Sequence, residues 1–432
     1  MTTHPELSVC VDTMAIDYEL AENPEYRDLA VVYDEELGEE INRYYYRPQT
    51  GEDLLKAFDL IVASTRMGDG FIPLAHDIGA DALNAISITA SVMKNDTYFE
   101  RIENYRTYLK KRDLAVVTAM TDVKGDRLLR PSDPGQKHAD FYVRVVDQND
   151  EGIIVRGAKV HITGAPYSNE IFVIPSRAMT EDDKDYAVAF ALPVNTKGIR
   201  MVGRPFHAHI SSLEFPNSRP VRVHTDALII FDDVFVPWDR VFMCGEWHHA
   251  ATLVYNFALL HRRTGCAYRI PMSEQFLGVA KAIADYNGIA KVPHVREKLT
   301  ELVIYLETLR SLSRAACLDF TSYGDIADHK VVKIIQDLAG GLLVTAPTYK
   351  DYQHPELHDD IDRYLAAKAD IPTENRLRMF DLTRRITGAD RETIALHGEG
   401  SLQAQRLTIL AEARKLIANC QKMVEEQAEI IT

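Results

Sequence analysis

The spacing of hydrophobic positions changes twice along the chain. From residue 1 to residue 113 the apolar residues recur mostly at helical spacing, and in the segment from Ile78 to Met93 they fall on or near one helix face. The segment from Ala21 to Glu40 mixes charged residues with an apolar stripe. These patterns predict an N-terminal domain, residues 1–113, that is mostly helical.

Residues 114–243 carry a different pattern, in which short β-rich segments are bounded by Gly, Pro, Asn and Asp. The segment from Glu151 to Val160 alternates like a strand of a hairpin. Because so many strands must hide their edges, we expect a closed or nearly closed antiparallel β-barrel that contains a long loop from Arg204 to Arg222. The other expected strands are Phe141 to Val146, Glu170 to Ile174, Tyr186 to Leu192 and Asp226 to Phe231.

Helical spacing returns in residues 244–432, which are expected to form a C-terminal helical bundle. Gly340 and Gly341 lie late in one apolar helix, where a glycine costs about 1 kcal/mol relative to alanine unless a close backbone approach requires it. The fold class is therefore α+β, with helices before and after a strand-rich domain. The expected helices are Leu277 to Tyr286, Val295 to Ala316, Lys330 to Leu343 and Leu402 to Thr432.

The composition argues against several classes of protein. The formal net charge of the 432-residue chain is −15, whereas a nucleic-acid-binding protein needs a basic face. The five cysteines are odd in number and include no Cys-x-x-Cys pair, which is typical of a reducing cytoplasm. No apolar run reaches the roughly 18 residues of a membrane-spanning helix. We therefore expect a cytoplasmic protein that binds neither nucleic acid nor a membrane.

Two polar turns carry side chains suited to binding a ligand. The first, Met120 to Arg127, follows an apolar run, and the second, His161 to Gly164, follows the alternating strand. Two turns that end neighbouring strands can present threonine hydroxyls and backbone N–H groups to one flat ligand, while Lys124 and Arg127 bind its phosphates. This combination indicates a dinucleotide such as a flavin; ordinary surface turns have the same composition. The candidate cofactor-binding residues here are Met120, Thr121, Asp122, Lys124, Gly125, Arg127, His161 and Thr163.

The segment Ala119 to Arg127 resembles the flavin loop of the family that holds the 4-hydroxyphenylacetate 3-monooxygenases and the 4-hydroxybutyryl-CoA dehydratases. The resemblance covers nearly the whole chain and implies an FAD site and the fold of the acyl-CoA dehydrogenases: helices, a β-barrel, then a helical bundle. The family's N-terminal leader of some tens of residues is missing here, so part of the substrate-site cover is expected to be absent or supplied otherwise. The further matching segments are Gly152 to Gly164, Ala178 to Ala187, Phe231 to Pro237, Asp337 to Gly341 and His397 to Arg406.

The resemblance also implies an oligomer. In the family, the segment that contains Asp337, Gly340 and Gly341 meets FAD held largely by a neighbouring subunit. We therefore expect a homotetramer or homodimer with FAD between subunits. The same resemblance places Thr163 near the N5 edge of the flavin.

His261 is the main candidate for acid–base chemistry. It lies on a helix, and Arg262 and Arg263 beside it would disfavour its protonated form. A neutral imidazole near a flavin can act as a general acid or base, whereas a histidine with a satisfied hydrogen bond would be structural. In the dehydratases the matching histidine ligates an iron–sulfur cluster and is assigned the proton abstraction. Asp226 stands where the dehydratases carry a glutamate, so it is either a second acid–base group or a carboxylate at a strand start.

The cluster ligands themselves are absent. The cysteine positions of the dehydratases fall near Pro73 and Asp77 and at Tyr268, and Cys266 is a lone thiolate two residues away. Since such clusters need about three or four thiolates, we expect no iron–sulfur cluster. Two histidine pairs, His207 with His209 and His248 with His249, have no nearby cysteine or carboxylate at convincing spacing. No other metal site is therefore expected.

The phenol-binding pattern of the monooxygenases is also lost, because its positions fall near Pro73, Asp77 and Thr118. A 4-hydroxyphenylacetate-like phenol is therefore not expected as the substrate. The leading hypothesis is an FAD-dependent monooxygenase that hydroxylates a small organic molecule. Its reduced FAD would come from a separate flavin reductase, because the chain has no Gly-x-Gly-x-x-Gly nicotinamide motif. The alternatives are a cluster-free acyl-CoA isomerase or dehydrogenase, and a catalytically silent flavin-binding subunit.

Overall fold

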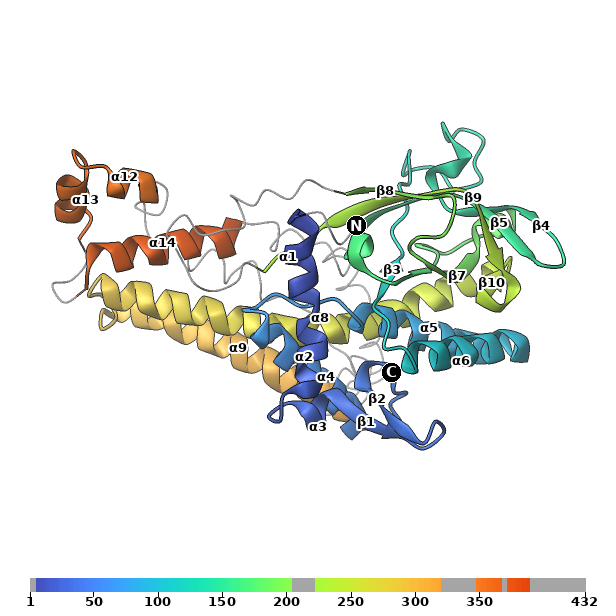
Figure 1. The fold of residues 1–432 in the computed structure, drawn as a ribbon, viewed down its shortest axis with the longest axis horizontal. Coiled ribbons are helices and arrows are strands. Elements are labelled where there is room, and N and C mark those ends of the chain that lie inside the picture. The colour runs from blue at the N-terminus through green and yellow to red at the C-terminus, as the bar shows by residue number, and fades with distance from the viewer. Residues whose placement is uncertain (1–4, 204–221, 320–346, 367–370, 389–432) are drawn as a thin grey trace, which may run out of the picture. The chain divides into compact units, whose positions relative to one another are not determined.

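The computed structural model describes residues 5–203, 222–319, 347–366 and 371–388 of the chain (Figure 1). The chain divides into two compact units, Met1–Gln275 and Phe276–Thr432. The division into three domains at residues 113 and 243 stays a prediction. Several predicted features lie outside the described residues: the loop 204–221, the helices 330–343 and 402–432, the segment 397–406, and the candidates Asp337, Gly340 and Gly341.

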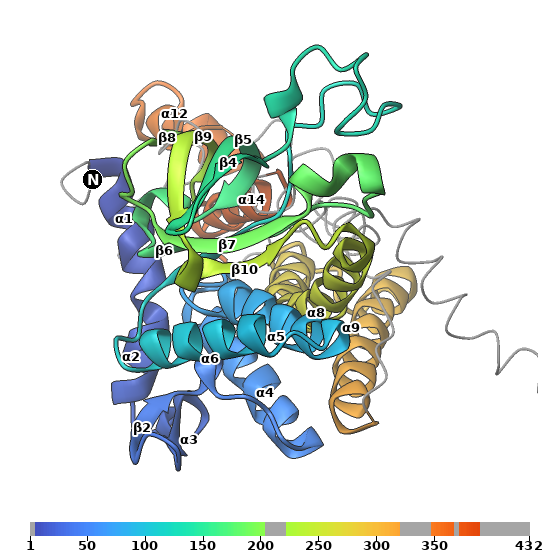
Figure 2. The same cartoon turned by 90° about the vertical axis from the view of Figure 1, so that its right-hand side faces the viewer.

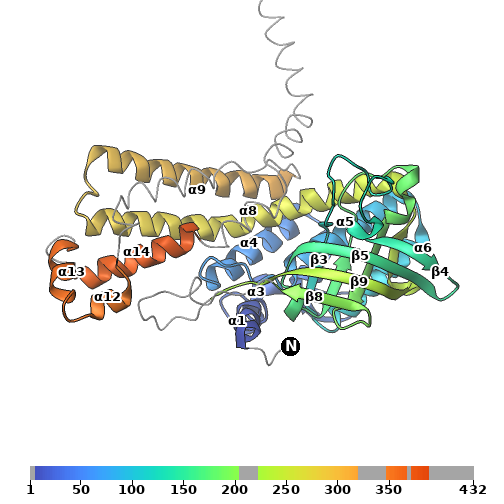
Figure 3. The same ribbon diagram turned by 90° about the horizontal axis from the view of Figure 1, so that it is seen from above.

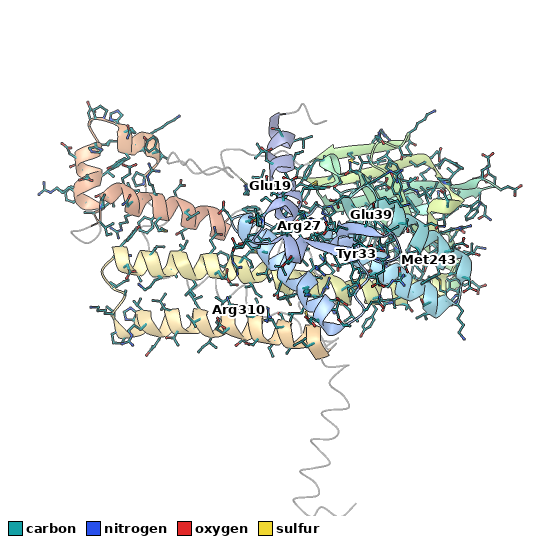
Figure 4. All side chains as sticks on the ribbon, turned by 60° about the horizontal axis from the view of Figure 1, so that its bottom comes forward. Glu19, Arg27, Tyr33, Glu39, Met243 and Arg310 are labelled. Atoms are coloured by element: carbon teal, nitrogen blue, oxygen red, sulfur yellow. The ribbon has the colours of Figure 1, made fainter. Side chains whose placement is uncertain are left out.

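The first unit begins with three short helices and a hairpin. The helices are α1 (Pro5–Met14), α2 (Ile16–Glu22) and α3 (Arg27–Ala30), and the hairpin strands are β1 (Val31–Asp34) and β2 (Glu39–Asn42). Figure 4 shows Arg27 of α3 close to this hairpin, and its guanidinium pairs with Glu40 of β2.

The described residues before 114 are mostly helical, as predicted, and this hairpin is the exception. The carboxylate of Asp34 accepts hydrogen bonds from the backbone N–H groups of Glu36 and Leu37, both 3.0 Å long. Gly38 completes the turn at a φ of +71°. These bonds fold the chain into a tight turn between two strands, although the apolar spacing around it is compatible with a helix.

Three longer helices follow: α4 (Gly51–Met67), α5 (Asp77–Met93) and α6 (Asp96–Lys110). The helix predicted from Ile78 to Met93 is confirmed by α5. α5 and α6 bury a common core, which includes Leu83 and Ile102, against Phe172 and Phe242 of a β-sheet. Figure 2 shows the two helices along one face of that sheet.

The strands form two four-stranded sheets. In the first, the order is β10-β7-β6-β3, and β3 pairs with β6 in parallel. In the second, the order is β4-β5-β9-β8, and all pairs are antiparallel. The strands are β3 (Val116–Ala119), β4 (Arg144–Gln148), β5 (Gly152–Thr163), β6 (Glu170–Val173), β7 (Val188–Pro193), β8 (Ile199–Gly203), β9 (Asp226–Pro237) and β10 (Val241–Cys244).

The predicted closed antiparallel barrel is therefore wrong for the part of the chain that the structure describes. The inner faces of the two sheets share one apolar core, in which the rings of Phe190 and Phe231 lie 5.7 Å apart and nearly perpendicular. Burial between the faces stabilises the pair of sheets without complete hydrogen-bonded closure. One isolated bridge, from Asp122 to Lys159, connects the loop after β3 to β5.

Short 3₁₀ helices connect several of these elements. They are η1 (Arg43–Tyr45), η2 (Ala139–Phe141), η3 (Ala165–Tyr167), η4 (Glu181–Tyr186) and η5 (Trp238–Arg240). The strand predicted from Phe141 to Val146 thus begins later, at Arg144, because η2 occupies the start of the segment.

Helix α8 (Trp247–Tyr286) starts in the first unit and ends in the second, and it contains Pro271. Figure 3 shows α8 and α9 (Pro293–Asp319) as long continuous helices, and the helices predicted at 277–286 and 295–316 lie within them. The second unit also has α12 (Tyr349–Gln353), α13 (His358–Tyr364) and α14 (Thr373–Gly388). None of the helices in the described ranges is long and apolar enough to span a membrane.

Candidate functional site

Three predicted site residues meet where β5 ends and β9 begins. Thr163 and Asp226 are partners in the antiparallel register, and the Thr163 hydroxyl donates a 2.5 Å hydrogen bond to Asp226 Oδ1. His161 Nδ1 lies 3.7 Å from Asp226 Oδ2. His161 has a φ of +59° within an irregular part of the ladder, a conformation that few non-glycine residues adopt. A hydroxyl, a carboxylate and an imidazole, all partly accessible, thus gather at one strand end.

The loop after β3 is fixed to the sheets through Asp122. This residue is only 3% exposed. Its Oδ1 lies 2.8 Å from Lys159 Nζ and accepts from the N–H of Val143, while its Oδ2 accepts from the Ser176 hydroxyl. Because both oxygens are engaged inside the protein, Asp122 holds its loop against the neighbouring strands.

Lys159 was missed by the sequence analysis. It is 2% exposed, and besides Asp122 its ammonium group donates to the carbonyls of Met120 and Ile174 at 2.8 and 2.9 Å. The alternating pattern of the strand could have indicated that Lys159 is buried, because Lys159 falls on the same side as the buried residues Ile153 and Val155. A lysine at a core-facing position requires buried partners.

The outer part of the same loop gathers positive charge. Burial, and then the charge of Arg127, lower the pKa of the half-buried Lys124, and Arg177 contributes in the same direction against the opposing effect of Asp122. Within the described residues, no carboxylate forms an ion pair with Lys124 or Arg127. Close cations without a paired carboxylate suit a diphosphate group.

Gly125 is required between these two cations. Its φ is +55°, and a Cβ atom there would lie 2.2 Å from the ring of Phe141. The loop therefore exposes backbone at this point, with Lys124 at a φ of +76° next to it. The residues present thus fit the phosphate-bearing part of a dinucleotide such as FAD.

His261 lies on α8 and is 6% exposed. Its ring stacks on Phe257 at a centroid distance of 5.3 Å, and its Nδ1 lies 3.8 Å from Asp81 Oδ2. Asp81, on α5, also pairs with Arg263 at 3.2 Å and accepts a 2.6 Å hydrogen bond from Thr264. The local sequence shows the arginines beside His261 but not this carboxylate, which lies against both the imidazole and Arg263.

Asp77, one helical turn before Asp81, is a second buried carboxyl group; the sequence placed it at a phenol-binding position of the family without giving it a catalytic role. It is 2% exposed; its Oδ1 accepts from the N–H of Ile78 at 2.7 Å, and no partner among the described residues reaches its Oδ2. Burial, and then the charges of Asp17 and Asp81, raise its pKa to about 8, although the Ile78 hydrogen bond and His261 oppose the shift. At neutral pH Asp77 is therefore mainly a neutral carboxylic acid.

His76 precedes Asp77 and is fully buried. Its Nε2 lies 3.1 Å from Asp113 and its Nδ1 lies 3.6 Å from Asp17, and the ring of Tyr44 stacks on it. Burial alone would lower the pKa of His76, but the two carboxylates outweigh it and raise the pKa to about 9. His76 is thus a buried cation at neutral pH.

Two of the positions that the resemblance assigns to phenol binding, those of Asp77 and Thr118, lie close together in the structure. Thr118 on β3 donates a 2.9 Å hydrogen bond to the carbonyl of Ile78, beside Asp77. Cys266 and Tyr268 are both buried on α8. Among the residues that the structure describes, no three His, Cys, Asp or Glu side chains could hold a metal ion together. These residues do not fit an iron–sulfur cluster.

The fold is that of the acyl-CoA dehydrogenases. A glutaryl-coenzyme A dehydrogenase structure superposes with a TM-score of 0.51 at 12% identity, covering 96% of this chain and 95% of that one. More narrowly, residues 1–243 match the N-terminal part of the 4-hydroxyphenylacetate 3-hydroxylase family, and residues 250–326 and 326–428 match its C-terminal part. The chain belongs to this family of flavoprotein enzymes.

Relatives in the family have different activities. The chain is 32% identical to the 4-hydroxybutyryl-CoA dehydratase/vinylacetyl-CoA-Δ-isomerase of Clostridium aminobutyricum, over 94% of this chain and 90% of that one. It is 31% identical to the oxygenase component of 4-hydroxyphenylacetate 3-monooxygenase of Thermus thermophilus, over 89% and 82%. Family membership therefore leaves the reaction open.

The similar solved structures belong to the same two kinds of enzyme. An oxygen-tolerant archaeal 4-hydroxybutyryl-CoA dehydratase from N. maritimus has a TM-score of 0.87 at 29% identity, covering 100% of this chain and 90% of that one. An oxygenase component of 4-hydroxyphenylacetate 3-monooxygenase, in complex with FAD, has a TM-score of 0.85 at 26% identity, covering 99% and 94%. FAD is thus a ligand of this architecture within the family.

Proposed function

We propose that this protein is an FAD-dependent monooxygenase that receives reduced FAD from a separate flavin reductase and hydroxylates a small organic substrate. The observation that carries the FAD assignment is the pair of cations Lys124 and Arg127. Neither has an ion-paired carboxylate among the described residues. Both lie in the loop after β3, a strand next to the Thr163–Asp226 pair. The relatives described as oxygenase components support the reaction type.

The residues of this chain divide the work between cofactor and substrate. Lys124 and Arg127 bind the FAD phosphates, and Thr163 with His161 binds the edge of the flavin ring. When bound, reduced FAD supplies the activation of molecular oxygen. His261 moves the substrate proton, and Asp81 orients its imidazole through Nδ1, as carboxylates commonly do for catalytic histidines.

The same residues restrict the substrate and the cofactors. Pro73, Asp77 and Thr118 replace the arginine, tyrosine and histidine that the resemblance assigns to phenol binding, which argues against a 4-hydroxyphenylacetate-like substrate. The chain lacks the three cysteines that ligate the cluster in the dehydratases, which argues against an iron–sulfur cluster. Anaerobic purification followed by iron and sulfide assays is expected to find neither element; about four irons per chain, the content of one cubane cluster, would contradict this.

A second candidate is a cluster-free acyl-CoA enzyme, such as a double-bond isomerase or a dehydrogenase. The specific observation in its favour is the buried pair of His261 and Asp81, which is suited to moving protons on carbon, together with the similarity to the dehydratase/isomerase. The two functions differ in their use of oxygen.

We also propose a homo-oligomer in which Asp337, Gly340 and Gly341 approach the FAD of a neighbouring copy. Gly340→Val is expected to lose FAD and assembly together, as measured by flavin absorbance and light scattering. A variant that stays assembled with full FAD content would show that the glycines serve only helix packing.

FAD binding is tested by titration of purified protein. Arg127→Ala is expected to weaken binding by about 1.5–3 kcal/mol, the usual contribution of a hydrogen bond to a charged group. Arg156→Ala is the matched control, because Arg156 is an exposed arginine that pairs with Asp233 on the neighbouring strand. Equal FAD affinity in both variants would overturn the assignment.

The reaction type is tested with NADH, FAD, a generic flavin reductase and isotopically labelled O₂. A monooxygenase transfers one labelled oxygen atom into one of a panel of small organic substrates. An acyl-CoA enzyme converts a trial acyl-CoA without transferring any labelled oxygen. A silent flavin-binding subunit binds FAD and does neither.

A further inference from the structure

Asp77 is a buried acid whose outer oxygen has no partner among the described residues. It is the first residue of α5, and its Oδ1 is held by the N–H of Ile78 at 2.7 Å. Its Oδ2 is buried without a hydrogen-bond partner in the same part of the structure. An unsatisfied buried oxygen destabilises the folded protein, because it has lost its hydrogen bonds to water. A position that retains such a cost needs an explanation, and a bound ligand supplies one.

The neighbours of Asp77 come from three helices. Asp17 belongs to α2, Asp81 lies one turn further along α5, and His261 belongs to α8. His76 precedes Asp77 in the chain and is paired with Asp17 and Asp113. Because residues four apart on a helix lie on the same face, Asp77 and Asp81 face the same region, and Asp81 lies 3.8 Å from the imidazole of His261.

We propose that Asp77 is the proton donor of the site and that it acts together with His261 to enolise a substrate that carries a carbonyl group next to an acidic C–H bond. A phenol needs only a base to become electron-rich. A carbonyl compound needs a base at carbon and an acid at oxygen, and this site contains both. The proposal rests on the proposed function, because it uses His261 as the group that moves the substrate proton.

The step is balanced in protons and electrons. The C–H bond of the substrate breaks and its proton bonds to the imidazole of His261. The O–H bond of Asp77 breaks and its proton bonds to the carbonyl oxygen, so the substrate becomes an enol, Asp77 a carboxylate and His261 an imidazolium. Return of one proton from His261 to Asp77 restores both groups. A carboxylic acid kept neutral by its surroundings is a known donor for such chemistry, as in ketosteroid isomerase.

Infrared difference spectroscopy tests the acid directly, without a substrate. The wild-type protein with FAD is expected to show the carbonyl band of a protonated carboxyl group at neutral pH, and the band should disappear as the pH rises through about 8, the pKa of Asp77. Asp77→Asn should lose the band, whereas Asp233→Asn, which changes an exposed aspartate, should keep it. A wild type without the band, or an Asp77→Asn variant that retains it, would overturn the proposal.

Hydrogen exchange tests the enolisation separately from any reaction with oxygen. The protein with oxidised FAD is kept anaerobic in D₂O with pyruvate, acetoacetate and acetyl-CoA as carbonyl probes. Deuterium uptake at the carbon next to the carbonyl is expected to fall about 100-fold in Asp77→Asn, the usual contribution of a positioned acid–base group. Asp77→Glu, which keeps the acid, should recover part of the rate, and FAD content should not change. No exchange with any probe in the wild type would overturn the substrate class, whether or not labelled oxygen is transferred in the aerobic assay.

Discussion

Two buried groups of charges in the first unit differ in how well their polar atoms are satisfied. In the sheet region, the three protons of the Lys159 ammonium group have three acceptors: Asp122 and the carbonyls of Met120 and Ile174. Both oxygens of Asp122 are likewise engaged. In the helical region, Asp77 Oδ2 has no hydrogen-bond partner in the described part of the chain.

The difference separates structural from functional charges. A fully satisfied network fixes one arrangement of its elements, here the loop after β3 against β5. Asp77 Oδ2, which has no hydrogen-bond partner among the described residues, adds no stability, and the pKa of about 8 suits this carboxyl group to exchanging a proton. Its neighbours His261 and Asp81 are suited to the same task.

The largest loss of stability is expected when Lys159 is replaced. Lys159→Met removes one partner of a buried ion pair and leaves Asp122 charged in the core, which should lower the free energy of unfolding by about 3–5 kcal/mol. Chemical denaturation monitored by fluorescence measures this change. The double variant Lys159→Met with Asp122→Leu removes both charges and should recover much of the loss. A single variant as stable as the wild type would show that the pair is not structural.

The dependence of stability on pH should separate the two groups of the helical region. The pKa of His76 is raised from 6.5 to about 9, so its contribution is present below pH 6.5 and is lost as the pH rises through about 9. The pKa of Asp77 is raised from 3.8 to about 8, so stability is also lost as the pH rises between these values. At about 1.4 kcal/mol per pKa unit, the change for His76 corresponds to about 3–4 kcal/mol and the change for Asp77 to about 6 kcal/mol.

The variant Asp77→Asn isolates the His76 contribution. The free energy of unfolding should fall less between pH 3.8 and about 8 than in the wild type, while the His76 contribution to the fall between 6.5 and about 9 remains. Denaturation curves at several pH values in both ranges provide the measurement. A profile parallel to that of the wild type throughout would mean that Asp77 is ionised in the folded protein.

The local elements could be predicted from the sequence, and the long-range contacts could not. The apolar spacing of Ile78 to Met93 identified α5 because a helix has a periodicity of its own. The barrel was wrong because strand patterns do not show whether two sheets close or stack. The hairpin of β1 and β2 depends on one turn around Asp34.

The candidate site shows the same division. His261, Thr163 and Asp226 were each named as candidates from the sequence, and the structure brings Thr163 and Asp226 together. Asp81 was missed because its hydrogen bond to Thr264 joins residues 183 positions apart in the chain. The protonation of Asp77 depends on burial and on Asp17, neither of which is visible in the local sequence.

A smaller effect on stability, with a large effect on rate, is expected at His261. His261→Gln keeps most of the side-chain volume, so melting temperature and FAD content should change little, while turnover falls about 100-fold or more. Hydrogen exchange into the carbonyl probes serves as the rate measurement. A variant that melts early but exchanges hydrogen at the wild-type rate would assign His261 a structural role against Phe257.

The smallest effect is expected at Arg156, which lies on the same strand as Lys159 and also pairs with an aspartate. Arg156 Nη2 lies 2.6 Å from Asp233 Oδ1, a shorter separation than that of the Lys159 pair, but the two side chains are 40% and 53% exposed. Water solvates both groups when the pair is broken, so Arg156→Ala should leave the denaturation midpoint unchanged within experimental error. Lys159→Met and Arg156→Ala therefore compare a buried and an exposed ion pair within one strand. A substantial loss of stability in Arg156→Ala would mean that pairing itself, and not the burial of the partner left behind, determines the cost of removing a charge from β5.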